Sequence, residues 1–191
     1  SLEGRRMDLE KIAGHFNRLL GYDSSVYQTL APHLNGGKIL SVGCGEGRVE
    51  SLIQRDLHAD IRGVEITRYK SQKIPIELYN GKRLPFPAKR FDTTLFVYML
   101  HHTEDIPALL GEARRVTKKE ILILDHTYTS SLGRWLLSLY DYGVNRAYRM
   151  PIPLNFLRIR EWTQVFEQCN LRVSEASILS ANNVFFKLRV R

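Results

Sequence analysis

Apolar and polar positions along the chain form two kinds of pattern, and the two alternate. Short runs that are largely apolar occupy residues 38–42, 61–66, 74–78, 93–99 and 121–125. Such a run predicts a strand that is buried on both faces of a sheet. Between the runs lie segments whose apolar residues are three or four positions apart, a spacing typical of amphipathic helices. The alternation predicts an α/β fold with a mostly parallel sheet that helices cover on both faces.

The helical patterns occupy residues 9–20, 24–34, 48–55, 104–115, 132–142 and 161–168. Only residues 67–73 separate the second predicted strand from the third, so a helix that crosses between them is limited to a turn or two. Two further β-like runs, 171–178 and 183–190, follow the last predicted helix. The pattern therefore predicts seven strands.

The length predicts a single domain. At 191 residues the chain can bury one good core, which is the usual size of one domain. Within it we distinguish N-terminal helices (1–35), a central core (38–126), an aromatic-rich segment (127–160) and a last helix with two strands (161–191). Any site must therefore be built on one scaffold.

Composition narrows the class of protein. Hydrophobic residues make up 43% of the chain and charged residues 25%, as in ordinary globular proteins rather than disordered ones. No run reaches about 18 apolar residues, and the polar start does not resemble a signal peptide. We therefore expect a cytoplasmic protein without stable membrane insertion.

The chain is strongly basic, with a formal net charge of +8. Such a charge suits an anionic partner, such as RNA, an acidic lipid surface or a phosphorylated metabolite. The lysines and arginines are scattered, without a run of five, and this favours the alternative of a solvated basic surface. Binding to nucleic acid is the less favoured expectation.

Cysteine and histidine spacing indicates no metal site. Cys44 and Cys169 provide neither a disulfide framework nor a pair of ligands at metal-binding spacing, and the histidines form no HExxH pattern. We expect neither a structural nor a catalytic metal.

A glycine-rich turn follows the first predicted strand directly, with the sequence Gly43-Cys44-Gly45-Glu46-Gly47. Glycine is suited to a sharp bend and to close approach of a ligand to the backbone. The N-terminus of the helix that follows offers unpaired N–H groups to an anionic group. A tight corner without a ligand is the structural alternative.

Glu65 adds a second polar feature at the same edge of the predicted sheet. It lies at the end of the second strand, 18 residues after Gly47. The carboxyl ends of parallel strands meet at one edge, where ligands bind in open α/β sheets. A carboxylate there can accept hydrogen bonds from both hydroxyls of a ribose. The alternative is a surface acid at a strand end.

Five segments together resemble a known family. They are VGCGEG at 42–47, Glu65, LPFP at 84–87, FDTTLFVYMLHH at 91–102 and ILILDH at 121–126. In order and spacing they are similar to the class I S-adenosylmethionine-dependent methyltransferases of the type 11 group, over residues 20–130. The resemblance implies a Rossmann-like, doubly wound, mostly parallel seven-stranded sheet with a helical lid after the fifth strand. It also implies that 38–126 is a cofactor-binding core.

The resemblance implies roles for individual residues. The glycines would cradle the amino-acid end of S-adenosylmethionine, Glu65 would hold its ribose and Asn80 would lie near its adenine. The implied cofactor-binding set is Gly43, Cys44, Gly45, Gly47, Glu65, Ile66, Asn80, Gly81, Lys82, Val97, Tyr98 and Met99. Two departures stand out: Asn80 replaces an acid, and Lys118-Lys119-Glu120 replaces a glycine pair before the fifth strand.

The expected reaction is an in-line displacement that yields S-adenosylhomocysteine. Its main requirement is alignment, and a general base is needed only when the acceptor loses a proton. The candidates at the right edge of the sheet are His101, His102, His126 and Tyr128. Capping or packing is the alternative role for the two adjacent histidines.

The aromatic segment 127–160 is the expected acceptor region. After the fourth strand the chain lacks the Asn/Asp-Pro-Pro-aromatic tetrad of enzymes that methylate adenine amino groups, and neither cysteine is placed to attack a base. A small organic acceptor is therefore favoured over a nucleic acid. The alternatives are an RNA methyltransferase and a non-catalytic cofactor-binding subunit. A nicotinamide oxidoreductase is disfavoured because Arg48 occupies the position of its third glycine.

Overall fold

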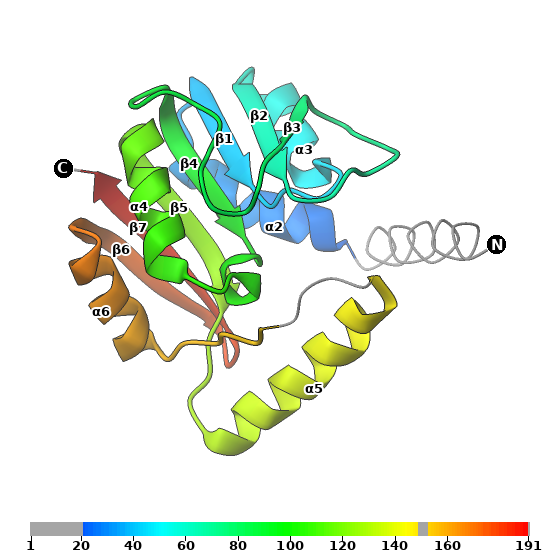
Figure 1. The fold of residues 1–191 in the computed structure, drawn as a ribbon, viewed down its shortest axis with the longest axis vertical. Coiled ribbons are helices and arrows are strands. Elements are labelled where there is room, and N and C mark those ends of the chain that lie inside the picture. Colours follow the sequence, from blue (N-terminus) through cyan, green and yellow to red (C-terminus); the bar gives the residue numbers. More distant parts are fainter. Residues whose placement is uncertain (1–20, 149–152, 191) are drawn as a thin grey trace.

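The computed structural model describes residues 21–148 and 153–190, and seven strands in these residues form one sheet in the order β3-β2-β1-β4-β5-β7-β6 (Figure 1). The strands β1 to β5 run parallel, β7 is antiparallel to β5, and β6 is antiparallel to β7. The strands are β1 (Lys38–Val42), β2 (Asp60–Glu65), β3 (Ile76–Leu78), β4 (Phe91–Val97), β5 (Thr117–His126), β6 (Leu171–Ser180) and β7 (Asn183–Val190). The predicted Rossmann-like, mostly parallel seven-stranded sheet is confirmed.

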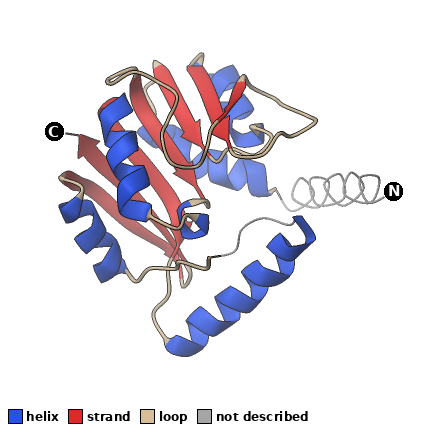
Figure 2. Cartoon of the chain, in the orientation of Figure 1, coloured by secondary structure: helices blue, strands red, loops and turns tan. Residues whose placement is uncertain are grey.

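Helices lie on both faces of the sheet, and one further long helix lies apart from it (Figure 2). They are α2 (Tyr22–Leu30), α3 (Arg48–Leu57), α4 (Ile106–Val116), α5 (Ser131–Tyr148) and α6 (Ile159–Gln168), with short 3₁₀ turns η1 (Ala31–His33) and η2 (Leu100–His102). The predicted helix over 9–20 lies outside the described residues. No helix among the described residues is long and apolar enough to cross a membrane.

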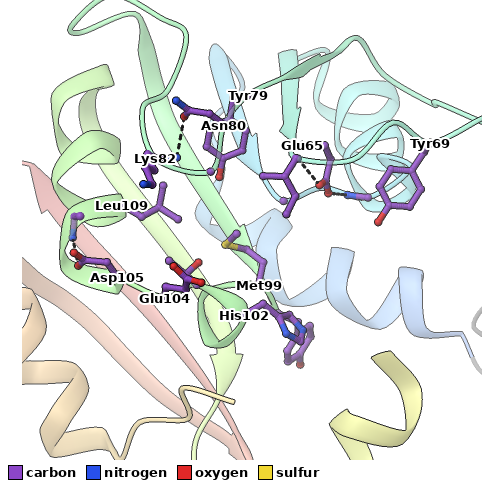
Figure 3. A pocket seen from close by; sticks show the side chains of 17 residues that line it. Glu65, Tyr69, Tyr79, Asn80, Lys82, Met99, His102, Glu104, Asp105 and Leu109 are labelled. Atoms are coloured by element: carbon purple, nitrogen blue, oxygen red, sulfur yellow. Dashed lines mark hydrogen bonds between the residues drawn. The ribbon is translucent and has the colours of Figure 1, made fainter. Parts of the chain in front are cut away.

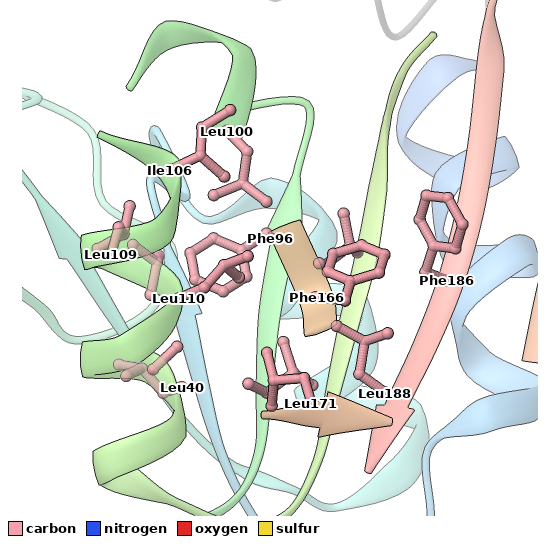
Figure 4. Packing of buried hydrophobic residues seen from close by; sticks show 14 of the residues in the cluster. Leu40, Phe96, Leu100, Ile106, Leu109, Leu110, Phe166, Leu171, Phe186 and Leu188 are labelled. Atoms are coloured by element: carbon pink, nitrogen blue, oxygen red, sulfur yellow. The ribbon is translucent and has the colours of Figure 1, made fainter. Parts of the chain in front are cut away.

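The alternation of side chains along the central strand β5 divides the core in two. Ile121 and Ile123 pack with α4 and α6 on one face of the sheet (Figure 4). Leu122 and Leu124 pack with α2 and α3 on the other. Successive strand residues point to opposite faces, so an apolar run such as ILIL must be covered on both sides. This pattern is the physical reason for the layered fold.

The connection between β2 and β3 contains no helix, contrary to the one or two turns predicted over 67–73. The Lys73 N–H donates to the Glu46 carbonyl at 2.8 Å, and the Gly63 N–H donates to the Pro75 carbonyl at 2.9 Å. The segment is thus held by hydrogen bonds to its neighbours, and seven residues leave no room for a helix as well. The segment crosses beside the glycine-rich turn.

Most other boundaries differ from the predicted ones by one to four residues, and strand β5 begins at Thr117 rather than at 121. Three differences have a visible structural context or are larger. Strand β4 ends at Val97 because Tyr98 has a positive φ of 49° and turns the chain. Strand β3 begins at Ile76, and Ile74 packs in the core instead. Helix α5 continues to Tyr148, six residues beyond the predicted end at 142. The ends of strands and helices are the part of a fold that sequence patterns place least well.

The packing of α6 against the sheet gives a prediction of stability. The Phe166 ring is fully buried, stacked on Trp162 and edge-on to Phe186. Phe166→Ala should lower the free energy of unfolding by about 3–5 kcal/mol, because it leaves a cavity between helix and sheet. Urea unfolding measures the change. Ile178→Ala, at a residue that is 68% exposed, is the control, and an equal loss in both variants would contradict this view of the core.

Candidate active site

A cavity of about 800 Å³ lies at the carboxyl edge of the sheet, beyond the ends of β1, β2, β3 and β4 and beside the start of α4 (Figure 3). The order of strands reverses between β1 and β4, which is where open α/β sheets bind ligands. Most of the residues that sequence analysis assigned to the cofactor line this cavity, namely Gly43, Gly45, Glu65, Ile66, Asn80, Gly81, Lys82, Tyr98 and Met99.

The three glycines of the turn have positive φ but serve different purposes. A Cβ on Gly43 would lie 2.9–3.0 Å from atoms of Met99, and one on Gly47 would lie 2.5 Å from Ile74. These two glycines therefore permit close packing. A Cβ on Gly45 would meet nothing within 4 Å, so its bare backbone faces open space in the cavity.

Three residues assigned to the cofactor do not line the cavity: Cys44, Gly47 and Val97. The Cys44 sulfur lies where a Cβ on Gly63 would be, beneath the turn, and burial raises the pKa of its thiol. Val97 packs with the cluster on the side of α2 and α3. Gly47 precedes α3 directly and allows the turn to enter that helix. These three residues thus lie at or near the turn without lining the cavity, and their roles are structural.

Glu65 joins the end of β2 to the glycine-rich turn. Its side chain is buried, with the residue only 4% exposed, and Oε1 accepts a hydrogen bond from the Gly45 N–H at 2.6 Å. Oε2 accepts one from the Ile66 N–H at 3.1 Å. Burial raises the pKa of Glu65, while the two hydrogen bonds oppose that rise. A carboxylate offers about four acceptor positions, so about two remain for a ligand.

The loop after β3 is shaped by Asn80. Its Oδ1 accepts hydrogen bonds from the N–H groups of Lys82 and Arg83, at 3.0 and 2.9 Å. Both lone pairs of this oxygen are thus in use, which leaves its NH₂ group as the polar group for a ligand. An adenine amino group that donated to this oxygen would require the loop to rearrange.

Sequence analysis missed several residues that line the cavity, among them Tyr69, Tyr79, Glu104 and Asp105. Tyr69 lies in the short connection that was expected to be helical. Asp105 caps α4, accepting a hydrogen bond from the Ala108 N–H at 2.9 Å. An Asp shortly before a proline-containing helix start is a readable capping signal, and it places both acids at the cavity wall.

The candidate catalytic residues are placed very differently. His102 lines the cavity, whereas His101, His126 and Tyr128 do not. Tyr128 is buried with Leu137 and Phe156, under the guanidinium groups of two arginines. His126 Nδ1 lies 2.9 Å from Asn183 Oδ1, at the start of β7. For Tyr128 and His126 the contacts are those of packing and capping.

His101 forms the centre of a buried ionic network. Its Nδ1 lies 2.5 Å from Asp125 Oδ1 and its Nε2 lies 3.5 Å from Oδ1 of Asp141 on α5. Burial alone would lower the pKa of His101, but the two carboxylates outweigh it and raise the pKa to about 9. Burial and the positive charge of His101 lower the pKa of His102 to about 4. At neutral pH His101 is therefore an imidazolium and His102 is neutral.

Asp141 is the member of this network that sequence analysis did not single out. One ligand atom from each of His101, His102 and Asp141 lies within 4.8 Å of the other two, a spacing at which a cation could be held. A proton on His101 already supplies positive charge between the two carboxylates. The expectation of no metal stays a prediction.

A family model described as a methyltransferase domain matches residues 11–176. The chain belongs to this family. Its fold is the class I fold of solved structures that include an S-adenosylmethionine-dependent methyltransferase of Aquifex aeolicus, at a TM-score of 0.65 and 13% identity, as the sequence resemblance implied. Gly45, with its bare backbone, and Glu65, with free acceptor positions, fit the amino-acid and ribose parts of that cofactor.

Individual relatives are distant. A phthiotriol/phenolphthiotriol dimycocerosates methyltransferase of Mycobacterium leprae is 25% identical over 138 residues, which are 66% of this chain and 51% of the relative. The chain thus spans about half the length of that relative. A possible histamine N-methyltransferase of Thermotoga maritima shares the fold at a TM-score of 0.68, with 18% identity and 95% and 98% of the two chains covered. Geranyl diphosphate C-methyltransferase of Streptomyces coelicolor does so at 0.71, with 12% identity and 88% and 76% covered.

Protonation of His101 predicts how stability depends on pH. The pKa of about 9 in the folded chain lies above the ordinary 6.5, so the contribution is complete below pH 6.5 and is lost as pH rises through 9. Between pH 7 and 10 the network should lose about 2–3 kcal/mol of unfolding free energy. Urea unfolding of the chain and of His101→Gln measures it, since the variant cannot titrate there. Parallel pH profiles of the two proteins would contradict the prediction.

Proposed function

We propose that this chain transfers the methyl group of S-adenosylmethionine to a small organic acceptor bound in the cavity beside Glu65. The observation that carries the proposal is the continuity of the cavity, which extends from the glycine-rich turn and Glu65 to His102 and the start of α4. Its volume of about 800 Å³ lies within the range of small-molecule sites. One wall would thus hold the cofactor and the other the acceptor.

The cofactor supplies an electrophilic methyl group when it is bound. The residues of the chain would align the two molecules: Glu65 by accepting hydrogen bonds from ribose hydroxyls, and Gly45 by letting the ligand approach its backbone. Met99 packs against Gly43 and lines the cavity beyond the turn, so it would limit where the reacting carbon can lie. Such alignment is the main contribution that a protein makes to an in-line displacement.

His102 is the candidate for contact with the acceptor. It lines the cavity, and its Nδ1 is buried without a hydrogen-bond partner among the described residues. A buried polar atom of this kind is costly, and a polar group of a bound molecule would satisfy it. With a pKa of about 4, His102 would be a weak proton acceptor, so its main role would be to orient the acceptor.

The charge of the cavity favours a neutral or cationic acceptor. Among the described residues that line it, three carry carboxylates, namely Glu65, Glu104 and Asp105, and one, Lys82, carries an ammonium group. This balance would repel the phosphates of RNA, which is the alternative acceptor that the net charge suggested. One relative is named for phthiotriol or phenolphthiotriol dimycocerosates and a structural neighbour for possible methylation of histamine. Neither name refers to a nucleic acid, in keeping with the proposal.

The proposed role of Glu65 predicts the effect of its removal. Glu65→Ala should weaken the binding of S-adenosylhomocysteine by about 1–3 kcal/mol, the scale of a lost charged hydrogen-bond partner. Titration calorimetry measures it. Glu77→Ala, on the neighbouring strand β3 with a side chain that is 44% exposed, is the matched control. Equal affinity of the folded Glu65 variant and the control would show that the ribose lies elsewhere.

The proposed role of His102 predicts a pH profile. Acceptors screened for release of S-adenosylhomocysteine should include a small neutral or cationic substrate. With it, His102→Asn should lower turnover by about tenfold or more while leaving cofactor affinity unchanged. Because the pKa of His102 is about 4, this side chain should stay neutral between pH 5.5 and 8. The pH profiles of turnover of the parent and of the variant should therefore have the same shape over that range. If none of the acceptors leads to release of S-adenosylhomocysteine, the non-catalytic alternative is favoured. If RNA is the one acceptor that does, the RNA methyltransferase is favoured.

A further inference from the structure

Helix α5 carries four large apolar residues on a side that faces away from the protein. Leu132, Trp135, Leu136 and Leu139 are 66%, 60%, 51% and 56% exposed. They are three and four positions apart, so they share one face of the helix and form a continuous stripe. We call these four residues the α5 stripe.

The opposite side of α5 is the one that contacts the rest of the chain. Leu137 is buried against Tyr128 and Phe156, and Asp141 is buried beside the histidine pair. Figure 1 shows α5 as a long helix at the margin of the molecule, apart from the two layers that cover the sheet. The usual orientation of an amphipathic helix, with its apolar face inward, is therefore reversed over the stripe.

Single exposed leucines are common on protein surfaces, but a contiguous apolar stripe that includes a tryptophan indicates a binding surface. Leaving the four side chains in water carries a free-energy cost that contact with an apolar partner would remove. The stripe is thus suited to a partner with an extended apolar surface.

Cationic groups lie at the N-terminal end of the same helix. The guanidinium groups of Arg134 and Arg158 lie 5.5 and 5.1 Å from the centre of the Tyr128 ring. Neither makes an ion pair with a carboxylate in the described part of the chain, and both residues are exposed. They add to a net charge of +8. A helix that has Trp and Leu on one face, and unpaired arginines near its N-terminal end on the other, has the character of helices that lie in the interface of an anionic bilayer.

We propose that α5 docks on an anionic lipid surface, with the α5 stripe in the acyl boundary and Arg134 and Arg158 at the level of the headgroups. This inference adds a location to the proposed methyltransferase. Asp141 on α5 lies 3.8 Å from Nε2 of His102, which lines the cavity, so the helix that meets the lipid also forms part of the site. The acceptor class is then an amphiphile whose reacting group is neutral or cationic.

Vesicle binding tests the proposal. The full chain should co-sediment with vesicles of phosphatidylcholine and phosphatidylglycerol, more weakly with phosphatidylcholine alone, and less as salt is raised. Brominated lipids should quench the fluorescence of Trp135, while Trp162, which is fully buried, provides the unquenched background.

Matched variants separate the two parts of the surface. Leu136→Ser with Leu139→Ser should reduce partitioning by about tenfold or more, as two exposed side chains lose their apolar area. Arg134→Gln with Arg158→Gln should abolish the preference for anionic vesicles. Ile178→Ser, at an exposed residue on β6, is the control and should bind as the parent does.

Three outcomes would overturn the proposal. The first is no binding to either vesicle, and the second is binding that the stripe variant leaves unchanged. The third is a dimer in solution that the stripe variant dissociates, since a second copy would then cover the stripe. Titration of each variant with S-adenosylhomocysteine keeps the tests apart, because no residue of the stripe lines the cavity and cofactor affinity should not change. If the parent chain binds S-adenosylhomocysteine but no vesicle, the docking surface is refuted and the proposed methyltransferase function still stands.

Discussion

The hydrogen bond between the Gly45 N–H and the carboxylate of Glu65 connects the two parts of the chain that the cofactor site requires. It joins the turn after β1 to the end of β2, at an edge that the parallel register of the two strands creates. Glu65 is buried, so its charge depends on the N–H groups of Gly45 and Ile66. The position of the turn and the position of the acid therefore depend on each other.

Much of the fold could be predicted because its strands must be covered on both faces. The runs 38–42 and 183–190 match β1 and β7 to the residue. Prediction failed where a local contact determines the backbone conformation. The segment 67–73 is held by hydrogen bonds from Lys73 and Gly63, and Tyr98 ends β4 through its positive φ. Neither cause appears in a pattern of apolar positions.

The candidate site likewise contains residues that could be predicted from the sequence and residues that could not. The glycines and Glu65 could be found because they follow strands directly, in an order that a known family shares. The ionic network around His101 could not, because it depends on Asp141, which lies 40 residues further along the chain on a helix with few described contacts to the body. The sequence does give the histidine pair, but only the packing shows that His101 is enclosed and that His102 faces the cavity.

Helix α5 connects the site to the surface of the molecule. Its inner side holds Asp141 against the histidines, and its outer side presents the α5 stripe to the surroundings. The chemistry of the cavity and the chemistry of the surface are thus carried by opposite sides of one element. A partner that moves α5 would also change the surroundings of His102.

The structure of a complex with S-adenosylhomocysteine tests the central claim most directly. The account predicts both ribose hydroxyls within hydrogen-bond distance of the Glu65 carboxylate and the amino-acid end against the backbone of Gly45. A nucleoside bound elsewhere, with Glu65 still enclosed by its own backbone hydrogen bonds and in contact with no ligand atom, would contradict it.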